Sequence, residues 1–404
     1  MKTLNKIIIT KTDSGILTAS VSGSRVTQLN LERETGSLLG NIYIGKVKNV
    51  SKNISAAFVD LGGGQMSYYS LTENPRHLLA SCPWEGSRLA APRPGDELIV
   101  QVSRDAVKTK DPVVTSNISF TGRYCVVTWG RCQIGFSSKI TDGDWKARMR
   151  KLLEDEKDSE FGIIVRTNAR SASEAAVLQE LKELKAQYRK LLSEAPHRTC
   201  YTCLYDAVPS YIASLRDTYQ DFMEEIVTDD QEIFLQIQKY LDTYQPENRG
   251  LARLYQDSLL PLKKLYSLEK AVAEALQKKV WLKSGGYLVI EPTEAMTVID
   301  VNSGKYAGKK NFRDTIRKIN LEAAAEIACQ LRLRNLSGII IADFIDMDRP
   351  EDREELMTVL TDWCGRDPVK TTVVDMTRLG LVEITRKKIR KPFREQMEKG
   401  EHET

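Results

Sequence analysis

The chain has 404 residues, of which 41% are hydrophobic and 28% charged, a composition that fits about two to four globular domains. No apolar run approaches the roughly 20 residues that span a membrane, and the run near the start is too short for a signal peptide, so we expect a cytoplasmic protein. A net charge of +4 does not mark the whole chain as a nucleic-acid binder, although residues 378–394 hold a basic cluster that either contacts phosphate or forms a solvated helix end.

Residues 1–120 are predicted to be mostly β-structure. The first of them should form a short strand, a second alternating strand over 16–21 and a polar helix over 25–34. Short strands separated by turn residues follow, and this spacing predicts a small β-barrel. The strands expected in the barrel are residues 40–50, 55–62 and 95–102.

The rest of the chain alternates helices and strands. Residues 113–140 continue with strand-like segments, 161–167 form a buried strand, and 200–260 mix both types. The sequence Ser171-Ala-Ser-Glu174 is typical of a capping box that opens a helix extending to about residue 192. The elements expected further on are helices over 233–243, 268–279 and 321–334, a turn and a strand within 281–290, and strands over 296–301, 338–345, 371–376 and 381–385.

Two aspartates, Asp300 and Asp343, end apolar strands that are separated by one amphipathic helix. A right-handed crossover would make these strands parallel neighbours, and ligands bind beyond the carboxyl ends of such strands. Two carboxylates at about 4 Å repel by roughly 4 kcal/mol at an effective dielectric of about 20, and a cation relieves that repulsion. Oxygen ligands favour magnesium, or manganese, over zinc. The alternative is that both aspartates cap the following helices.

Asn302 lies two residues beyond Asp300 and therefore on the same side of an extended strand, where its amide can hydrogen-bond a phosphate or a water molecule. Asp346 and Asp348 follow Asp343 closely. Asp346 would point away from Asp343 if the strand continued, so it is a weaker candidate. The predicted site therefore consists of Asp300, Asn302 and Asp343.

Two further groups of residues could contact a nucleic acid. Arg166 and Thr167 end a strand, where a guanidinium and a hydroxyl can hold a terminal phosphate, although a surface ion pair is the alternative for the arginine. In the expected barrel, Phe58 and Tyr68 could stack on bases, and Lys108 and Lys110 could provide positive charge beside them. Phe58 could equally belong to the core.

Several common active sites are excluded by the sequence. It contains no P-loop, no Gly-x-Gly-x-x-Gly opening a helix and no Gly-x-Ser-x-Gly elbow. With only three histidines, a histidine relay or a zinc hydrolase is not expected. The seven cysteines are an odd number and fit reduced thiols. Cys200 and Cys203 have metal-ligand spacing, but no second pair follows at the spacing of a zinc site, so a structural role is favoured.

Five segments of the C-terminal third carry a family resemblance. They are Lys279-Val-Trp-Leu-Lys-Ser-Gly-Gly-Tyr-Leu-Val-Ile290, Thr297-Val-Ile-Asp-Val-Asn-Ser-Gly304, Asn320-Leu-Glu-Ala-Ala-Ala-Glu-Ile-Ala-Cys-Gln-Leu-Arg-Leu-Arg-Asn-Leu336, residues 338–347, and Leu379-Gly-Leu-Val-Glu-Ile-Thr-Arg386. In this order they resemble the RNase E and RNase G family of bacterial endoribonucleases. Weaker likeness covers residues 40–71, 95–140 and 161–167, so the resemblance spans about residues 4–394.

The resemblance implies an α+β multidomain fold. An S1-type OB barrel and a 5′-sensor region would be inserted into a split RNase H-like subdomain, followed by a DNase I-like catalytic domain. The expected boundaries are 1–37 and 201–279 for the two RNase H-like parts, 38–120 for the barrel, 121–200 for the sensor region, 280–394 for the catalytic domain and 395–404 for a polar tail.

The family's functional residues fall on particular positions of this chain. Its two magnesium-binding aspartates fall on Asp300 and Asp343, and the accompanying asparagine on Asn302. The barrel residues that clamp single-stranded RNA fall on Phe58 and Tyr68, with Lys110 in the cationic flank. The residues of its 5′-monophosphate pocket fall on Arg166, Thr167, Gly122, Val126 and Lys370.

The chain departs from the family pattern at three places. Tyr68 stands where the family has phenylalanine, and Lys370 where it often has arginine, which holds phosphate more rigidly. Family members usually carry a Cys-x-x-Cys zinc link after the catalytic domain, and residues 387–404 contain no cysteine. No zinc link is therefore expected, and a homodimer would have to form without it.

The sequence thus predicts a magnesium-dependent endoribonuclease that cleaves single-stranded RNA in RNA processing and decay and prefers a 5′-monophosphate. One rival is a non-catalytic RNA-binding or ribosome-associated protein that has kept the barrel. A nuclease directed at DNA is another.

Overall fold

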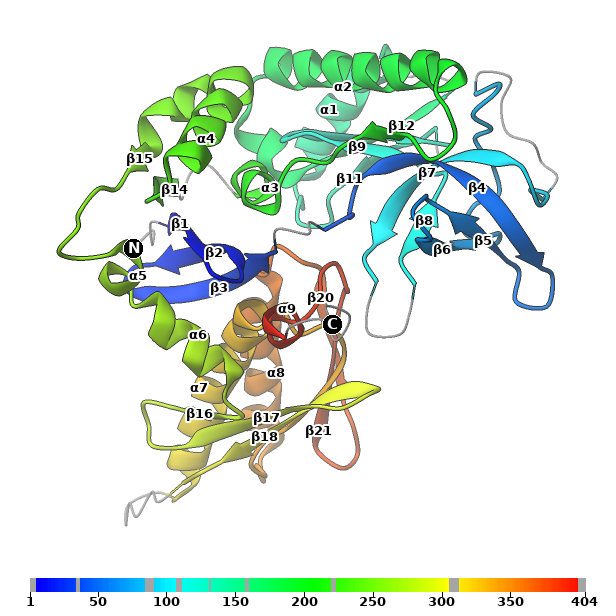
Figure 1. Cartoon of the computed structure of the whole chain (residues 1–404). Helices are drawn as coiled ribbons and strands as arrows, with labels where there is room; N and C mark the ends of the chain where they lie inside the picture. The colour runs from blue at the N-terminus through cyan, green and yellow to red at the C-terminus, as the bar shows by residue number, and fades with distance from the viewer. Residues whose placement is uncertain are drawn as a thin grey trace. The chain divides into compact units, whose positions relative to one another are not determined.

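The computed structural model of the chain describes residues 5–33, 37–83, 91–106, 111–130, 132–156, 160–218, 223–304 and 312–398. It divides into two compact units, each described here by itself (Figure 1). The middle unit comprises Gly36–Asp221, and the terminal unit joins Met1–Thr35 to Phe222–Thr404. Among the described residues, no helix has the length and apolar character needed to cross a membrane.

The first half of the middle unit is a closed β-barrel, as predicted. Its strands are β4 (Ile42–Ser51), β5 (Ala56–Asp60), β6 (Met66–Ser70), β7 (Glu97–Arg104) and β8 (Val113–Thr115). The order is β4-β5-β6-β8-β7, and the barrel closes because β4 also pairs with β7. Val59, Tyr69 and Val100 are among the buried side chains of its core. The short strand β13 (Cys203–Tyr205) adds to the free side of β4.

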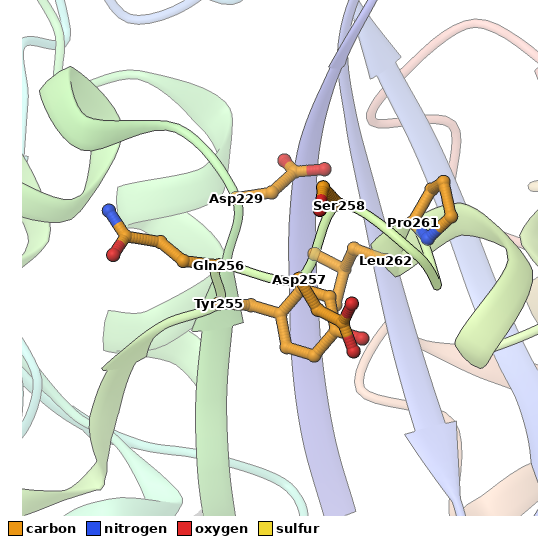
Figure 2. Close-up of a pocket in the computed structure, with 7 residues that line it drawn as sticks. All are labelled: Asp229, Tyr255, Gln256, Asp257, Ser258, Pro261 and Leu262. Carbon is orange, nitrogen blue, oxygen red and sulfur yellow. The ribbon is translucent and has the colours of Figure 1, made fainter.

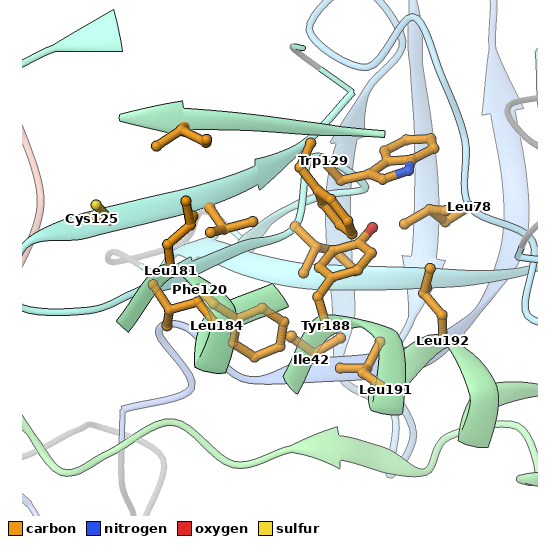
Figure 3. Close-up of a cluster of buried hydrophobic side chains, with 14 of the residues drawn as sticks. Ile42, Leu78, Phe120, Cys125, Trp129, Leu181, Leu184, Tyr188, Leu191 and Leu192 are labelled. Carbon is orange, nitrogen blue, oxygen red and sulfur yellow. The ribbon is translucent and has the colours of Figure 1, made fainter. Parts of the chain in front are cut away.

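The second half of the middle unit is a four-stranded sheet covered by a long helix. The sheet order is β11 (Ile134–Phe136), β12 (Phe161–Val165), β10 (Cys125–Trp129) and β9 (Ser119–Thr121). The remaining helices are α1 (Gly143–Glu154), α2 (Glu174–Glu194) and α3 (Ser210–Asp217). Figure 3 shows Tyr188 and Leu184 of α2 packed with Phe120 and Trp129 of the sheet. The predicted helix start is close to the observed one, since Ser173 caps α2 by accepting from the amide of Ala176.

The terminal unit begins with a five-stranded sheet that joins distant parts of the sequence. Its order is β15 (Ala252–Leu254), β14 (Met223–Thr228), β1 (Asn5–Thr12), β2 (Gly15–Ser22) and β3 (Arg25–Glu32). β1 pairs in parallel with β14 and antiparallel with β2. The associated helices are α4 (Gln231–Tyr244), α5 (Leu262–Leu265) and α6 (Leu268–Leu276).

The helix predicted over 25–34 is wrong, because β3 occupies Arg25–Glu32. Val26 and Leu29 are both buried, and their separation by three positions imitates a helical period. The three-residue separation of Val26 and Leu29 comes from a β-bulge and not from a helix, since the pairing of β2 with β3 shifts register between Ser20 and Val21. A bulge of this kind inserts one extra residue and interrupts the alternation of a strand.

The C-terminal sheet of the terminal unit has six strands. Their order is β16 (Lys279–Trp281), β17 (Tyr287–Pro292), β18 (Met296–Asn302), β19 (Gly338–Asp343), β21 (Leu381–Arg386) and β20 (Thr371–Met376). Helices α7 (Phe312–Leu333) and α8 (Pro350–Gly365) pack on one face (Figure 1), and α9 (Phe393–Met397) ends the described chain. The prediction that β18 and β19 are parallel neighbours joined through a helix is confirmed.

Arg394, an exposed residue at the start of α9, is the one member of the basic cluster over 378–394 that lies in a helix, so most of the cluster is not a helix end. The cluster begins in the turn before β21 and continues through that strand, whose last residue, Arg386, is buried. The Arg386 guanidinium pairs with Asp367 at 2.8 Å and donates to the carbonyl of Leu336. One member of the cluster is therefore a structural cation, while Lys387 and Lys388 are exposed.

Candidate functional site

Asp300 and Asp343 lie directly opposite each other on two neighbouring strands. The parallel pairing of β18 with β19 places Asp300 against Asp343 in register. In β18, alternate side chains from Thr297 to Val301 are buried under the helices, which leaves Asp300 on the open face. Asp343 is exposed as well. The strand alternation and the crossover helix together bring the two carboxylates to one place.

Asn302 lies beside Asp300, on the side of the strand that the sequence pattern predicts. It is the last residue of β18, and its side-chain Nδ2 donates a hydrogen bond of 2.7 Å to Oδ2 of Asp300. The hydrogen bond fixes the orientation of the amide, so its carbonyl oxygen is directed away from Asp300. We therefore describe Asp300, Asn302 and Asp343 together as the carboxylate site.

The electrostatics of the carboxylate site are those of crowded negative charges. Partial burial and the negative charges of Asp300 and Asp346 raise the pKa of the Asp343 carboxyl. Among the described residues, no three His, Cys, Asp or Glu side chains converge to form a closed metal site. The arrangement is therefore an open pair of carboxylates whose mutual repulsion a bound cation would relieve.

Asp346 is closer to the carboxylate site than strand alternation suggested. β19 ends at Asp343, so the alternation that would turn Asp346 away does not extend to it. Its charge acts on Asp343, and it belongs to the loop that leads towards α8. The alternative that both aspartates cap helices is wrong, because Asp300 lies within β18 and the cap of α8 is Arg349.

Phe58 and Tyr68 form an aromatic pair on the outside of the barrel. They are directly paired between β5 and β6, and their rings meet edge to face with centroids 6.3 Å apart. Both are half-buried, whereas Ala57 and Val59 on either side of Phe58 are fully buried. Phe58 is therefore not a core residue. The predicted lysines of this site, Lys108 and Lys110, lie outside the described residues.

Arg166 and Thr167 follow β12, and both already have partners within the chain. The Arg166 guanidinium donates to Asp217 Oδ1 at 2.8 Å and to the carbonyl of Gly122 at 2.5 Å. Thr167 donates through its hydroxyl to Ser137 at 3.1 Å. The ion pair considered for Arg166 thus exists. It is only partly at the surface, since the arginine side chain is 22% exposed. Burial opposes the ionised form of Asp217, but Arg216 and Arg166 lower its pKa overall.

The loop that contains Gly122 is held by a glutamate that the sequence did not single out. Glu180 of α2 accepts hydrogen bonds from the amides of Arg123, Tyr124 and Cys125 at 2.5–2.8 Å. A Cβ at position 122 would collide with this carboxylate. Burial raises the pKa of Glu180, while the three amides and the charge of Arg166 oppose that rise.

The other predicted sensor residues lie on separate elements. The amide of Gly122 donates to the carbonyl of Cys125 at 2.9 Å, and Val126 is a partly exposed residue of β10 paired with Thr121. Lys370 belongs to the terminal unit, where its exposed side chain precedes β20. The structure thus brings Arg166, Gly122, Asp217 and Glu180 together in the middle unit.

Two further features carry no site chemistry of their own. Cys203 pairs with Tyr43 on β4, and the Cys200 thiol lies 3.9 Å from the carbonyl of Ile44, so both support the barrel edge.

A shallow pocket is lined by residues around Asp229, Tyr255 and Asp257 (Figure 2). Its carboxylates accept from the hydroxyl of Thr10 and from backbone amides, and none of the predicted site residues that the structure describes lines it.

The known proteins to which the chain is similar all belong to one family. The model of the family described as "Ribonuclease E/G family" matches residues 119–389. The chain is 35% identical to "Ribonuclease G" of Haemophilus influenzae over 92% of its own length and 77% of the relative's. It is 33% identical to "Ribonuclease G" of Escherichia coli strain K12, over 95% and 80% of the two chains. It is also 36% identical to "Ribonuclease E" of Synechocystis, over 88% of this chain and 53% of that protein.

Proposed function

This chain belongs to the ribonuclease E/G family of endoribonucleases, and we propose that it hydrolyses internal phosphodiester bonds of single-stranded RNA at the carboxylate site. The observation that carries the proposal is the in-register pairing of Asp300 with Asp343 on an open sheet face. This site would serve RNA processing and decay.

The carboxylate site fits a divalent cation of the magnesium type, with manganese as a substitute. Its donors are carboxylate oxygens on neighbouring strands, which suit a hard cation, and a site with two carboxylates leaves positions for water and substrate. A cation held by Asp300 and Asp343 would supply charge neutralisation at the phosphate and an activated water. Burial and, after it, the negative charges of Asp300 and Asp346 raise the pKa of Asp343, and the part due to Asp300 supports this assignment.

The residues of the chain would have separate roles in binding the cation, the phosphate and the bases. Asp300 and Asp343 hold the cation, and Asn302 uses its amide to orient either the scissile phosphate or the attacking water. The hydrogen bond from Asn302 to Asp300 favours this role because it fixes the amide before substrate binds. Phe58 and Tyr68 would stack on unpaired bases, with Lys110 contributing charge, which would select single strands over duplexes.

We also propose that Arg166 and Thr167 bind a 5′-monophosphate, with Gly122, Val126 and Lys370 as the further contacts. The guanidinium is held in one orientation by Asp217 and by the Gly122 carbonyl, which supports a preformed pocket. The same Asp217 carries negative charge, so the phosphate has to share or displace this partner.

The remaining proposals concern architecture. The sheet that joins β1–β3 to β14 and β15 supports a split RNase H-like subdomain, and the six-stranded sheet supports a DNase I-like catalytic domain. The closed barrel supports an S1-type OB subdomain. A cytoplasmic location and a homodimer without a zinc link stay predictions.

The main test is cleavage of a 5′-monophosphorylated, AU-rich, single-stranded RNA by Asp300→Asn and Asp343→Asn. Each variant should lose at least about a thousandfold in rate, because several kcal/mol of charge stabilisation would be lost, while retaining RNA affinity. Asp375→Asn, on β20 of the same sheet, is the matched control. Magnesium-dependent cleavage by both site variants would contradict the proposal. Binding without cleavage by the unaltered protein would favour the RNA-binding rival, and faster cleavage of the matching DNA would favour the DNA nuclease.

Arg166→Ala tests the 5′-end proposal separately. It should slow cleavage of 5′-monophosphorylated RNA by roughly tenfold, the effect of one lost charge-assisted contact, and should slow 5′-triphosphorylated RNA less. Arg170→Ala, an exposed arginine of the adjacent turn, is the control. Equal slowing of both substrates by Arg166→Ala would remove the sensor role.

A further inference from the structure

The open face of the six-stranded sheet carries two rows of side chains that meet at the carboxylate site. Strand pairing sets Lys279 opposite Val289, Val289 opposite Asp300, and Asp300 opposite Asp343. It also sets Trp281 opposite Tyr287, and Tyr287 opposite Asn302. Residues directly opposite each other share a face of the sheet, so both rows lie on the face of the carboxylates.

The second row begins with an aromatic pair, the exposed Trp281 and the half-buried Tyr287, and the Lys279 side chain of the first row lies against both rings. The Trp281 and Tyr287 rings are tilted at 60° with centroids 5.3 Å apart. The Lys279 ammonium lies 3.5 Å from the centre of the Tyr287 ring and 4.1 Å from that of Trp281. Trp281 nevertheless remains 65% exposed. Such cation–π contacts fix the positions of all three side chains without covering the indole.

The spacing places this cluster one nucleotide away from the carboxylates. Neighbouring strands are about 4.8 Å apart, so Tyr287 lies one strand from Asn302 and Trp281 lies about 10 Å from it. An RNA strand whose phosphate lies at Asp300 and Asp343 can therefore place an adjacent base over the rings. Lys279 belongs to the row of Asp300, but its ammonium leans over the two rings, beside the path that the next phosphate would take.

The charge of the cluster indicates what kind of partner covers it. Within the described part of the chain, the Lys279 ammonium has no carboxylate at ion-pair distance. A second copy of the chain would have to bury this cation, and interface cores are depleted in lysine. A strand of RNA fits both the aromatic rings and the ammonium of the cluster, since bases stack on aromatic rings and phosphates neutralise the ammonium.

We propose that Trp281, Tyr287 and Lys279 form a binding platform for the nucleotide next to the scissile phosphate. The base stacks on the exposed indole of Trp281, beside the Tyr287 ring that the Lys279 ammonium covers, and Lys279 contacts the phosphate of the same nucleotide. This inference rests on the proposed endoribonuclease function and adds a subsite that would influence which bond is cut.

The test combines a substrate series with protein variants. Each RNA in the series lacks the base at one position near a single cleaved bond. With the unaltered protein, loss of the base at one position should reduce kcat/KM roughly tenfold, the effect expected of one lost base–aromatic stack. With Trp281→Ala, the complete RNA should be cleaved about tenfold more slowly and should be insensitive to the missing base at that position. Trp281→Phe should restore part of the sensitivity.

Tyr244→Ala is the matched control, since Tyr244 is an exposed aromatic residue on α4 and should show the sensitivity of the unaltered protein. Thermal unfolding checks that the variants are folded. If the unaltered protein cleaves RNA and Trp281→Ala keeps the same sensitivity at every position, the platform is refuted while the proposed function stands. Absence of cleavage by the unaltered protein refutes the proposed function instead. A lower solution mass of Trp281→Ala alone would overturn the platform in favour of a subunit interface.

Discussion

The carboxylate site and the Arg166 loop are built on opposite electrostatic principles. At the carboxylate site, Asp300 and Asp343 face each other on adjacent strands, and their repulsion contributes to a raised pKa of Asp343. Around Arg166, each charge has an opposite charge or several amides as partners within the chain. At the carboxylate site the facing charges have the same sign, whereas around Arg166 the charges are balanced within the chain. The first therefore gains from a ligand that neutralises it, and the second has to exchange partners to bind one.

The largest expected effect on stability is in the Arg166 loop, where Glu180 accepts the backbone amides. Glu180→Ala would leave the amides of Arg123, Tyr124 and Cys125 without their acceptor, and we expect a loss of about 3 kcal/mol in the free energy of unfolding. Glu183→Ala, an exposed position on the same helix, should change it by less than about 0.5 kcal/mol. Denaturant unfolding measures both. A loss below about 1 kcal/mol for Glu180→Ala would show that the loop does not depend on this carboxylate.

The carboxylate site was predictable from the sequence because it depends on local pattern. Apolar runs that end in aspartates on either side of one helix fix the strand pairing, and alternation then places Asn302 beside Asp300. Glu180 and Asp217 were not predictable, since their partners lie 55 and 51 residues away along the chain. β3 was missed because a bulge imitates the helical period at Val26 and Leu29. Pairing between distant residues and register shifts leave no local signal.

A smaller effect is expected from the charge that competes for Arg166. Asp217→Asn keeps an oxygen that can accept from the guanidinium but removes the negative charge, so a 5′-phosphate should bind more readily. We expect the preference for 5′-monophosphorylated over 5′-hydroxyl RNA to rise about two- to fivefold, the usual scale of one partly exposed ion pair. Asp217→Ala should lower it instead, because the guanidinium loses its orientation. Unchanged preference in both variants would show that Arg166 does not meet the phosphate.

The smallest predicted effect concerns how the stability of the protein changes with pH. The contributions of Asp217 and Asp343 to stability should change with pH in opposite directions, and thermal unfolding in the presence of a chelator measures both. The folded-state pKa of Asp217 is lowered, so its ionised form adds stability above the unfolded pKa of about 3.9, and this is lost as pH falls through the folded pKa. Asp217→Asn should therefore be less stable than the unaltered protein at pH 7 and should converge with it in acid.

Asp343 should behave in the opposite way, because its folded-state pKa is raised. A raised pKa favours the protonated form, so its stabilising contribution is present below the unfolded pKa and is lost as pH rises through the folded pKa. Asp343→Asn removes a carboxylate that directly faces Asp300 and should be more stable at pH 7 by about 0.2–1 kcal/mol, a difference that vanishes in acid. Added magnesium should stabilise the unaltered protein more than this variant. If Asp343→Asn is less stable at pH 7 without magnesium, the two carboxylates do not repel, and the contrast between the two regions fails.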